Sequence, residues 1–157
     1  MLRRFLAAVT LSALIAMPGS HASANSDSVI EYRQHLMRAI GGHMAAVAAI
    51  VKGRLPLTEH IAEHAELIEN AAELVPAAFE EQVSDGLTDV QPEIWSRMDE
   101  FVELNAEMSK ASAALAKAAE EGDMRDIAMA MQSLGKSCGS CHQPFRKPKE
   151  ESYKQPR

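Results

Sequence analysis

Apolar side chains recur at three- and four-residue steps along almost all of the chain after residue 24, and this period restricts the fold. Aromatic residues make up only 4% of the chain, and β-branched residues seldom alternate with polar ones over the length of a strand. The pattern predicts amphipathic helices over residues 28–51, 59–75 and 92–120. A fourth is expected to begin at residue 124 and to end at Pro144. Because their connections are mostly short, we expect an all-α, antiparallel four-helix bundle in which the first and last helices share an end.

Glycine, proline and capping residues mark the ends of these helices. Gly53 is expected to follow the last turn of the first helix as its C′ residue, Thr58 to cap the second, and Pro76 to end or kink it. Pro92 fits the first turn of the third helix, and Asp123 is a capping residue for the fourth.

Gly41 and Gly42 lie inside the first helix, where each glycine costs about 1 kcal/mol relative to alanine. This cost predicts the close approach of a bulky group, either another helix or a flat cofactor. At the other end of the chain, the basic tail is expected to be frayed beyond Lys147.

The first 24 residues have the organisation of an export signal. Arg3 and Arg4 precede an uncharged apolar stretch, residues 5–17, and Ala22-Ser23-Ala24 matches a small-residue cleavage site. The apolar stretch is too short for a comfortable membrane span, although an uncleaved anchor is the alternative. We therefore expect residues 1–24 to be a signal peptide, residues 25–157 to form one domain, and the protein to reside in the periplasm.

Acidic residues outnumber basic ones, 22 against 16, and removal of the signal peptide enlarges this excess. Such a balance disfavours nucleic acids and anionic membrane surfaces as partners. No second apolar run reaches the length of a membrane span, so we expect no stable membrane insertion.

The only two cysteines, Cys138 and Cys141, precede His142 in a Cys-x-x-Cys-His motif. This motif is the attachment signature of a c-type haem. Residues three and four apart share one face of a helix, so both thiols could reach the vinyl groups while the imidazole reaches the iron. We expect one haem c and its iron, with Cys138 and Cys141 forming thioethers and His142 as the proximal ligand. Haem attachment through this motif is normally completed outside the cytoplasm, in agreement with an export signal.

Two other uses of the cysteines are less consistent with the chain. A thiol redox protein would show a βαβ context, which is absent, and a zinc site would need a fourth ligand. His60 and His64 have i, i+4 spacing that could bind a metal, but the surrounding glutamates favour a solvated acidic face. His35 and His43 flank the apolar stripe of the first helix and are expected at the surface or the cavity rim.

The ligand on the other side of the iron is the open question. Methionine is the usual sulfur donor in electron-transfer haems, and most methionines of this chain are expected to fill the core. Topology favours Met37 and Met44, both on the inner stripe of the first helix. Met37 is closer to the start of that helix, and therefore closer to the end expected to hold His142.

Three segments resemble the class II cytochromes c, which include the cytochromes c′ and their low-spin relatives. Residues 32–37 resemble the opening helix motif, Tyr-Arg-Gln followed shortly by a haem-facing residue. Residues 92–95 resemble the start of the family's third helix, and residues 135–146 its C-terminal haem segment. The resemblance covers essentially the whole chain after residue 24 and implies a four-helix bundle with a C-terminal haem.

Met37 falls at the haem-facing position of this family. In the low-spin branch a methionine there binds the iron, whereas in cytochromes c′ the iron stays five-coordinate, even in some members that carry methionine. The run from Arg38 to Ala45 is more similar to the low-spin branch. The resemblance therefore implies Met37 as the distal ligand.

The resemblance also singles out two arginines. Arg33 lies on the apolar stripe and needs an anionic partner such as a haem propionate, unless its guanidinium snorkels to the bundle end. Arg146 follows His142 by four residues. It could lie beside the imidazole and favour its neutral form, or be a solvated residue that complements the helix dipole.

The leading interpretation is a periplasmic monohaem cytochrome with His/Met ligation that carries single electrons between periplasmic or membrane-bound redox proteins. The alternative is a five-coordinate, cytochrome c′-like protein that binds nitric oxide or carbon monoxide. No catalytic triad, carboxylate pair or phosphate loop is present, so we do not expect an enzyme. An exposed stripe on the first two helices could support a homodimer, although no residue pattern requires one.

Overall fold

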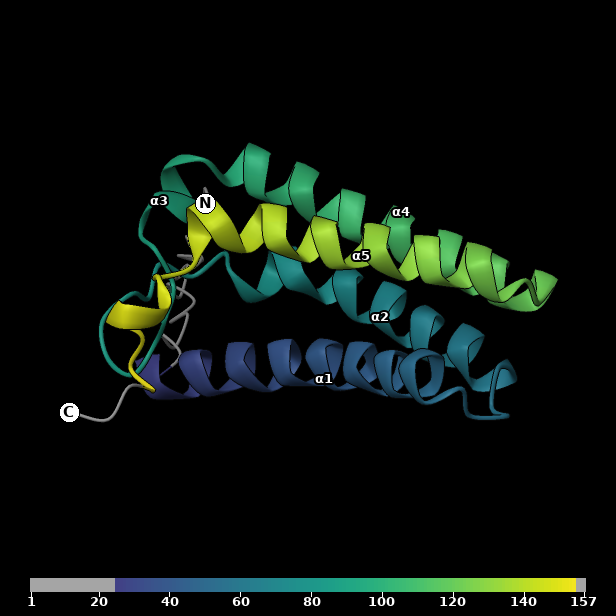
Figure 1. Ribbon diagram of the computed structural model, residues 1–157. Helices are drawn as coiled ribbons and strands as arrows, with labels where there is room; N and C mark the ends of the chain where they lie inside the picture. Colours follow the sequence, from purple (N-terminus) through teal and green to yellow (C-terminus); the bar gives the residue numbers. More distant parts are fainter. Residues whose placement is uncertain (1–24, 155–157) are drawn as a thin grey trace, which may run out of the picture.

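The computed structural model describes residues 25–154, which form the expected all-α bundle (Figure 1). The predicted signal peptide, residues 1–24, lies outside the described residues. Within the described part, no helix combines the length and apolarity that crossing a membrane requires. The elements are α1 (Ser26–Gly53), α2 (Glu59–Ala78), α3 (Glu93–Ser96), α4 (Met98–Glu121), α5 (Met124–Phe145) and a 3-10 helix, η1 (Lys149–Glu151).

The four long helices run antiparallel to their neighbours in sequence. α2 packs along both α1 and α4, and α4 packs along α5, whereas α1 and α5 touch at few points. Figure 1 shows the start of α1 and the end of α5 at the same end of the bundle, as the connectivity predicted.

The predicted third helix, residues 92–120, is two helices rather than one. Arg97 separates α3 from α4 with non-helical dihedral angles, φ −129° and ψ 38°. Ile94 is 1% exposed, and the Trp95 Nε1 donates a hydrogen bond to the Phe79 carbonyl at 2.8 Å. The hydrogen bond ties α3 to the residue that follows α2, and α3 also packs on α5 and α4, so the chain turns at Arg97 before α4 begins.

The helix-end predictions were partly right. Asp123 caps α5, since its Oδ1 accepts hydrogen bonds from the Arg125 and Asp126 amides at 2.8 and 3.2 Å. Gly53 is instead the last residue of α1, and Arg54 takes the left-handed position with φ 50°.

Two prolines and one threonine also differ from expectation. Thr58 precedes α2 but makes no side-chain capping bond. Pro76 and Pro144 lie inside the last turns of α2 and α5 instead of ending them.

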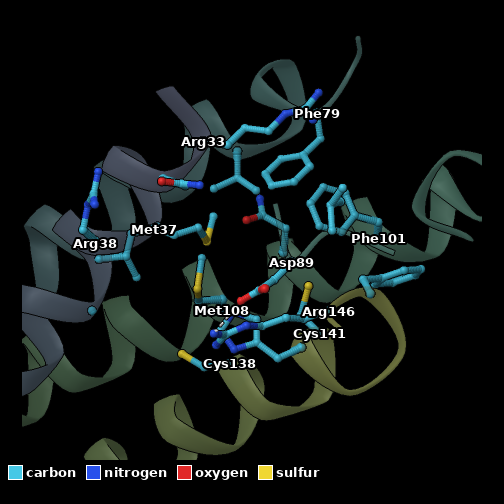
Figure 2. A pocket seen from close by; sticks show the side chains of 18 of the residues that line it. Arg33, Met37, Arg38, Phe79, Asp89, Phe101, Met108, Cys138, Cys141 and Arg146 are labelled. Carbon is cyan, nitrogen blue, oxygen red and sulfur yellow. Dashed lines mark hydrogen bonds and ion pairs between the residues drawn. The ribbon is translucent and has the colours of Figure 1, made fainter. Parts of the chain in front are cut away.

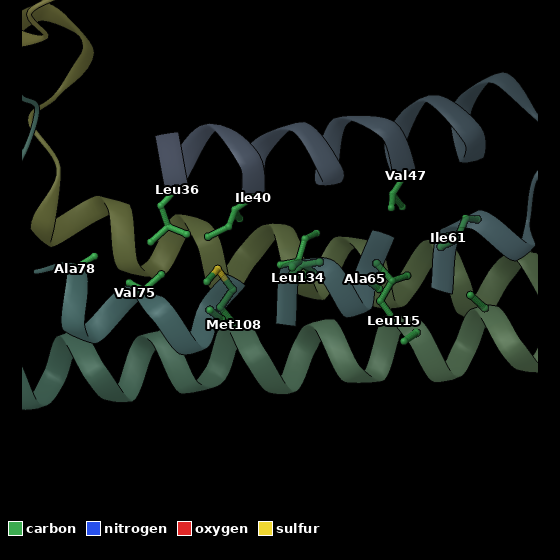
Figure 3. Packing of buried hydrophobic residues seen from close by; sticks show 14 of the residues in the cluster. Leu36, Ile40, Val47, Ile61, Ala65, Val75, Ala78, Met108, Leu115 and Leu134 are labelled. Carbon is green, nitrogen blue, oxygen red and sulfur yellow. The ribbon is translucent and has the colours of Figure 1, made fainter. Parts of the chain in front are cut away.

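One half of the bundle has a continuous aliphatic core, which we call the closed half. Figure 3 shows Val47, Ile61, Ala65 and Leu115 meeting there from α1, α2 and α4, and all four are fully buried. Ile127 of α5 is also fully buried. Burying a side chain of the size of leucine or isoleucine stabilises a fold by about 1.5–3 kcal/mol, so these layers hold the helices together.

The described part of the tail, residues 146–154, folds back onto the loop before α3, so residues 148–154 are not frayed, contrary to expectation. The Asp89 carboxylate accepts hydrogen bonds from the Ser152 hydroxyl at 3.0 Å and the Tyr153 amide at 3.1 Å. The Lys147 amide donates to the Asp89 carbonyl at 2.7 Å. Asp89 therefore attaches the tail to the end of the bundle where α1 begins.

Candidate functional site

The other half of the bundle encloses a cavity of about 440 Å³, and we call it the cavity half (Figure 2). Residues of α1, α2, α4 and α5 line this cavity, together with the loop around Asp89 and the C-terminal tail. α1 and α5, which have few direct contacts with each other, both line it. The cavity thus brings together the start of α1 and the end of α5, which are about a hundred residues apart in sequence.

The Cys-x-x-Cys-His motif forms the α5 wall of the cavity. Cys138, Cys141 and His142 all line it, as their helical spacing predicted. Both cysteines are half-buried and are not paired in a disulfide.

Burial raises the pKa of both thiols, that of Cys141 to about 11. The two cysteines therefore lack the stabilised thiolate that thiol redox chemistry uses. No group of three histidine, cysteine or acidic side chains within residues 25–154 could hold a metal ion, which also disfavours the zinc interpretation.

His142 lies at the cavity rim, where its ring keeps access to solvent. The surrounding protein atoms partly desolvate the ring and lower its pKa, and Arg146 lowers this pKa further. A neutral imidazole keeps the nitrogen lone pair that a metal ion requires.

Arg146 is held next to His142 by an ion pair with Asp89 at 3.2 Å. The Arg146 amide also donates to the His142 carbonyl and ends α5. Its effect on the imidazole agrees with the first of the two interpretations made from the sequence.

Methionines dominate the wall that faces the motif. In Figure 2, Met37 of α1 and Met108 of α4 project into the space bordered on α5 by Cys138 and Cys141. Met37 is half-buried, and Met44, further along α1, lines the same cavity. The register argument thus correctly placed Met37 in the cavity that contains His142, whereas its ligation of iron stays a prediction.

Arg33 lines the cavity but does not snorkel to solvent, since it is only 4% exposed. Its Nε donates to the Ala78 carbonyl at 2.7 Å and its Nη1 to the Val83 carbonyl at 2.8 Å, while Nη2 donates to the Glu81 carbonyl. The guanidinium also lies over the Phe79 ring, 4.8 Å from its centroid.

Arg33 therefore fastens the loop after α2. Burial lowers its pKa, and the nearby Glu81 opposes this shift. Three of its five N–H donors are used by carbonyls, and a contact of the others with a haem propionate stays a prediction. Backbone carbonyls occur at every residue, so the sequence carried no signal for these partners.

The described residues fit a haem in three respects. Two free thiols and an imidazole line one wall, and their helical spacing matches covalent attachment. Gly41 lines the cavity, and a Cβ placed on it would meet no atom within 4 Å in the described structure. This open space contradicts the close helix approach considered for Gly41 but is compatible with a flat cofactor. Arg38 and Lys154 line the cavity as well and supply positive charge for carboxylates.

The tail residues Tyr153 and Lys154, which also line the cavity, were missed by sequence reasoning. The polar residues around Asp89 have no helical periodicity that would have shown them packing back on the bundle. Only the proximity of Arg146 to the motif hinted that this segment belongs to the site.

Comparison with known proteins agrees with the fold and the motif. The family model described as Cytochrome C′ matches residues 28–146. Cytochrome c′ of Pararhodospirillum photometricum is 40% identical over 124 residues, covering 78% of this chain and 99% of the relative. Cytochrome c-556 of Agrobacterium tumefaciens (strain II Chrys) is 35% identical over 122 residues, covering 74% of this chain and 95% of the relative.

A solved structure supports the same assignment. A ferrous variant of cytochrome c prime from Alcaligenes xylosoxidans with bound NO superposes with a TM-score of 0.71 and 28% identity. The match covers 81% of this chain and 99% of that one. The chain therefore belongs to the cytochrome c′ family of class II cytochromes, whose members carry one covalently attached haem c with its iron.

Proposed function

We propose that this protein is a five-coordinate haem protein that binds nitric oxide or carbon monoxide on the side of the haem opposite His142. Cys138 and Cys141 would hold the haem as thioethers, and His142 would be its proximal ligand. When bound, the haem supplies an iron centre able to take a diatomic gas or exchange one electron.

The apolar character of the wall facing the motif is the observation that carries this proposal. Ile40, Val75, Leu104 and Met108 contribute no strong hydrogen-bond donor to the cavity. Asn105 directs its Nδ2 to the Ala72 carbonyl at 3.0 Å, which leaves its buried Oδ1, an acceptor, unpaired. A small neutral gas loses little by entering past these apolar side chains.

Relatives support this choice between the two interpretations made from the sequence. The Pararhodospirillum photometricum protein is named a cytochrome c′, and the Alcaligenes xylosoxidans structure holds nitric oxide. Both favour gas binding over the leading interpretation made from the sequence alone.

Electron transfer with His142 and Met37 as the two iron ligands is the second candidate. The thioether of Met37 lies in the cavity that contains His142, and the Agrobacterium relative is named cytochrome c-556. Periplasmic or membrane-bound redox proteins would then be the partners. A homodimer formed through α1 and α2 is compatible with either function.

The cellular context belongs to the same proposal. Residues 1–24 would direct export and be removed, and residues 25–157 would act as one periplasmic domain. We assign no catalytic residue, and the protein would bind or carry without turning over a substrate.

Absorption spectra of the ferric, ferrous and carbon monoxide-treated protein separate the two candidates. Gas binding predicts a high-spin ferrous spectrum that changes with carbon monoxide, and Met37→Ala should leave the spin state unchanged. A low-spin spectrum that resists carbon monoxide and becomes high-spin in Met37→Ala would establish electron transfer instead. Met44→Ala, which changes another cavity methionine of α1, is the matched control.

A separate assay tests the haem assignment. A pyridine haemochrome of c type that stays with the polypeptide in acid acetone is expected. Its loss in a Cys138→Ser/Cys141→Ser variant would tie the attachment to the motif. A wild-type protein without this absorption would contradict both candidates.

A further inference from the structure

Outside the cavity, α1 and α2 bring two histidines into direct contact. The Nδ1 atoms of His43 and His64 are 3.0 Å apart, and their ring centroids are 5.2 Å apart with planes tilted by 43°. Both side chains are half-buried, so the pair remains accessible to ions from solvent. The sequence interpretation placed His43 at the surface or the cavity rim and His64 on a solvated acidic face, and it did not predict this contact.

Two Nδ1 atoms at this distance need something between them. If both carried lone pairs, they would repel each other, so the contact requires either a shared proton or a cation. The shared proton corresponds to a hydrogen bond between one Nδ1–H and the other Nδ1. The cation corresponds to a metal ion bound by both imidazoles.

The helices place the two nitrogens at a spacing that a metal ion could bridge after each ring rotates, because the 5.2 Å between ring centroids leaves the Nδ1 atoms facing each other almost head-on. Imidazole nitrogens bind zinc at about 2.0–2.1 Å, and copper and nickel prefer square-planar or tetragonal sites. At such bond lengths, adjacent nitrogens lie roughly 2.9 Å apart across a square-planar edge and roughly 3.3 Å apart across a tetrahedral one. The observed 3.0 Å is closest to the square-planar value.

We propose that His43 and His64 form a binding site for a divalent transition metal, with Cu²⁺ preferred and water completing the coordination. The general affinity order of nitrogen sites places Cu²⁺ above Ni²⁺ and Zn²⁺. The site joins α1 to α2 and involves none of the residues proposed to hold the haem.

The local charges suit a cation. Glu63 neighbours His64 on α2 and acts electrostatically on its ring. His60 lies one turn before His64 and is exposed, so it is the nearest additional imidazole on α2.

Equilibrium dialysis of tag-free holoprotein against Cu²⁺, with electron paramagnetic resonance of the bound ion, tests the site. We expect one saturable Cu²⁺ per chain with nitrogen hyperfine structure in its spectrum. His43→Gln and His64→Gln should each weaken binding by at least about tenfold. His35→Gln, which removes an exposed histidine of the same α1, should leave binding unchanged.

Three results would overturn the proposal. The first is absence of saturable binding to the wild type, which would leave the contact as a hydrogen bond. The second is binding that survives both substitutions in protein with unchanged helical circular dichroism and haem absorption. The third is loss of binding in His60→Gln and His64→Gln but not in His43→Gln, which would assign the metal to the i, i+4 pair of α2.

Discussion

The closed half and the cavity half are built from the same four long helices, yet different interactions stabilise them. In the closed half, Ile61, Leu115 and Ile127 are fully buried against one another's helices. In the cavity half, α1, α2, α4 and α5 line a space of about 440 Å³. The closed half therefore completes its own core, whereas the cavity half needs a bound group to complete its packing.

In the cavity half, polar contacts at the end of the bundle stabilise segments that the core does not hold. Arg33 binds the carbonyl of the last residue of α2 and two carbonyls of the segment that follows, and Asp89 binds the C-terminal tail. These bonds hold the rim of the cavity in place without filling it. Packing between helices thus stabilises the closed half, whereas hydrogen bonds to loops and the tail stabilise the rim of the cavity half.

Loss of haem attachment should have the largest effect on stability, and it should act more strongly on the cavity half than on the closed half. We expect Cys138→Ser/Cys141→Ser to destabilise the protein by more than about 4 kcal/mol, as the loss of a structural group can. Hydrogen exchange should show larger loss of protection at Ile40, in the cavity half, than at Leu115. Ser140→Ala, an exposed position between the two cysteines, is the control and should keep the haem. Equal loss of protection in both halves would contradict the conclusion that different interactions stabilise them.

Leucines in the two halves should respond differently to truncation. Leu115→Ala removes a fully buried side chain and should lower the free energy of unfolding by about 3 kcal/mol. Leu104→Ala, at a half-buried position on the cavity wall, should cost about 1 kcal/mol. Urea unfolding of the holoproteins measures both values. Similar losses would show that the cavity half is packed as tightly as the closed half.

Arg33→Met should cost about 2 kcal/mol, because it leaves buried carbonyls after α2 without their donor. Urea unfolding provides the value, and limited proteolysis should show earlier cleavage in residues 79–83. Lys52→Met removes an exposed cation from the same helix and should change stability by less than about 0.5 kcal/mol. A change confined to the haem absorption, with an unchanged loop, would instead indicate that Arg33 acts mainly on the haem.

The smallest effect should be a pH dependence of the contact between α1 and α2. The pKa of His64 is lowered by burial and by the neighbouring His43 and His60, while Glu63 opposes the shift. The unfolded chain therefore takes up a proton more readily, and His64 contributes stability above its ordinary pKa of 6.5 that is lost as pH falls below it.

Urea midpoints measured in metal-free buffer between about pH 7 and pH 5 test this sign. The wild type should lose more stability on acidification than His64→Gln, whose side chain does not titrate. Parallel pH profiles for the two proteins would remove His64 from this role.

Local patterns predicted the architecture well. The three-to-four-residue period located the four long helices, and the motif spacing placed Cys138, Cys141 and His142 on one wall. Connectivity alone brought Met37 into the same cavity. Each of these predictions depends on residues close in sequence or on the direction of neighbouring helices.

The missed features join distant segments through polar groups. Nothing in the sequence around Arg33 identifies the carbonyls that it binds, and nothing near Asp89 indicates that the tail returns to it. The His43–His64 contact likewise depends on how α1 and α2 align along their length. Iron ligation by Met37 depends on the bond geometry around the metal, which a helical register does not specify.

The attachment of the tail to Asp89 has a consequence for the order in which the site is completed during synthesis. The ribosome makes α1, α2 and α4 before Cys138 and Cys141 are translated, and Ser152 and Tyr153 come later still. Three of the four long helices around the cavity, α1, α2 and α4, are therefore complete in the chain before either cysteine is made. The last residues of the site both line the cavity and close its open end, so a prematurely terminated chain would keep the thiols but lose this closure.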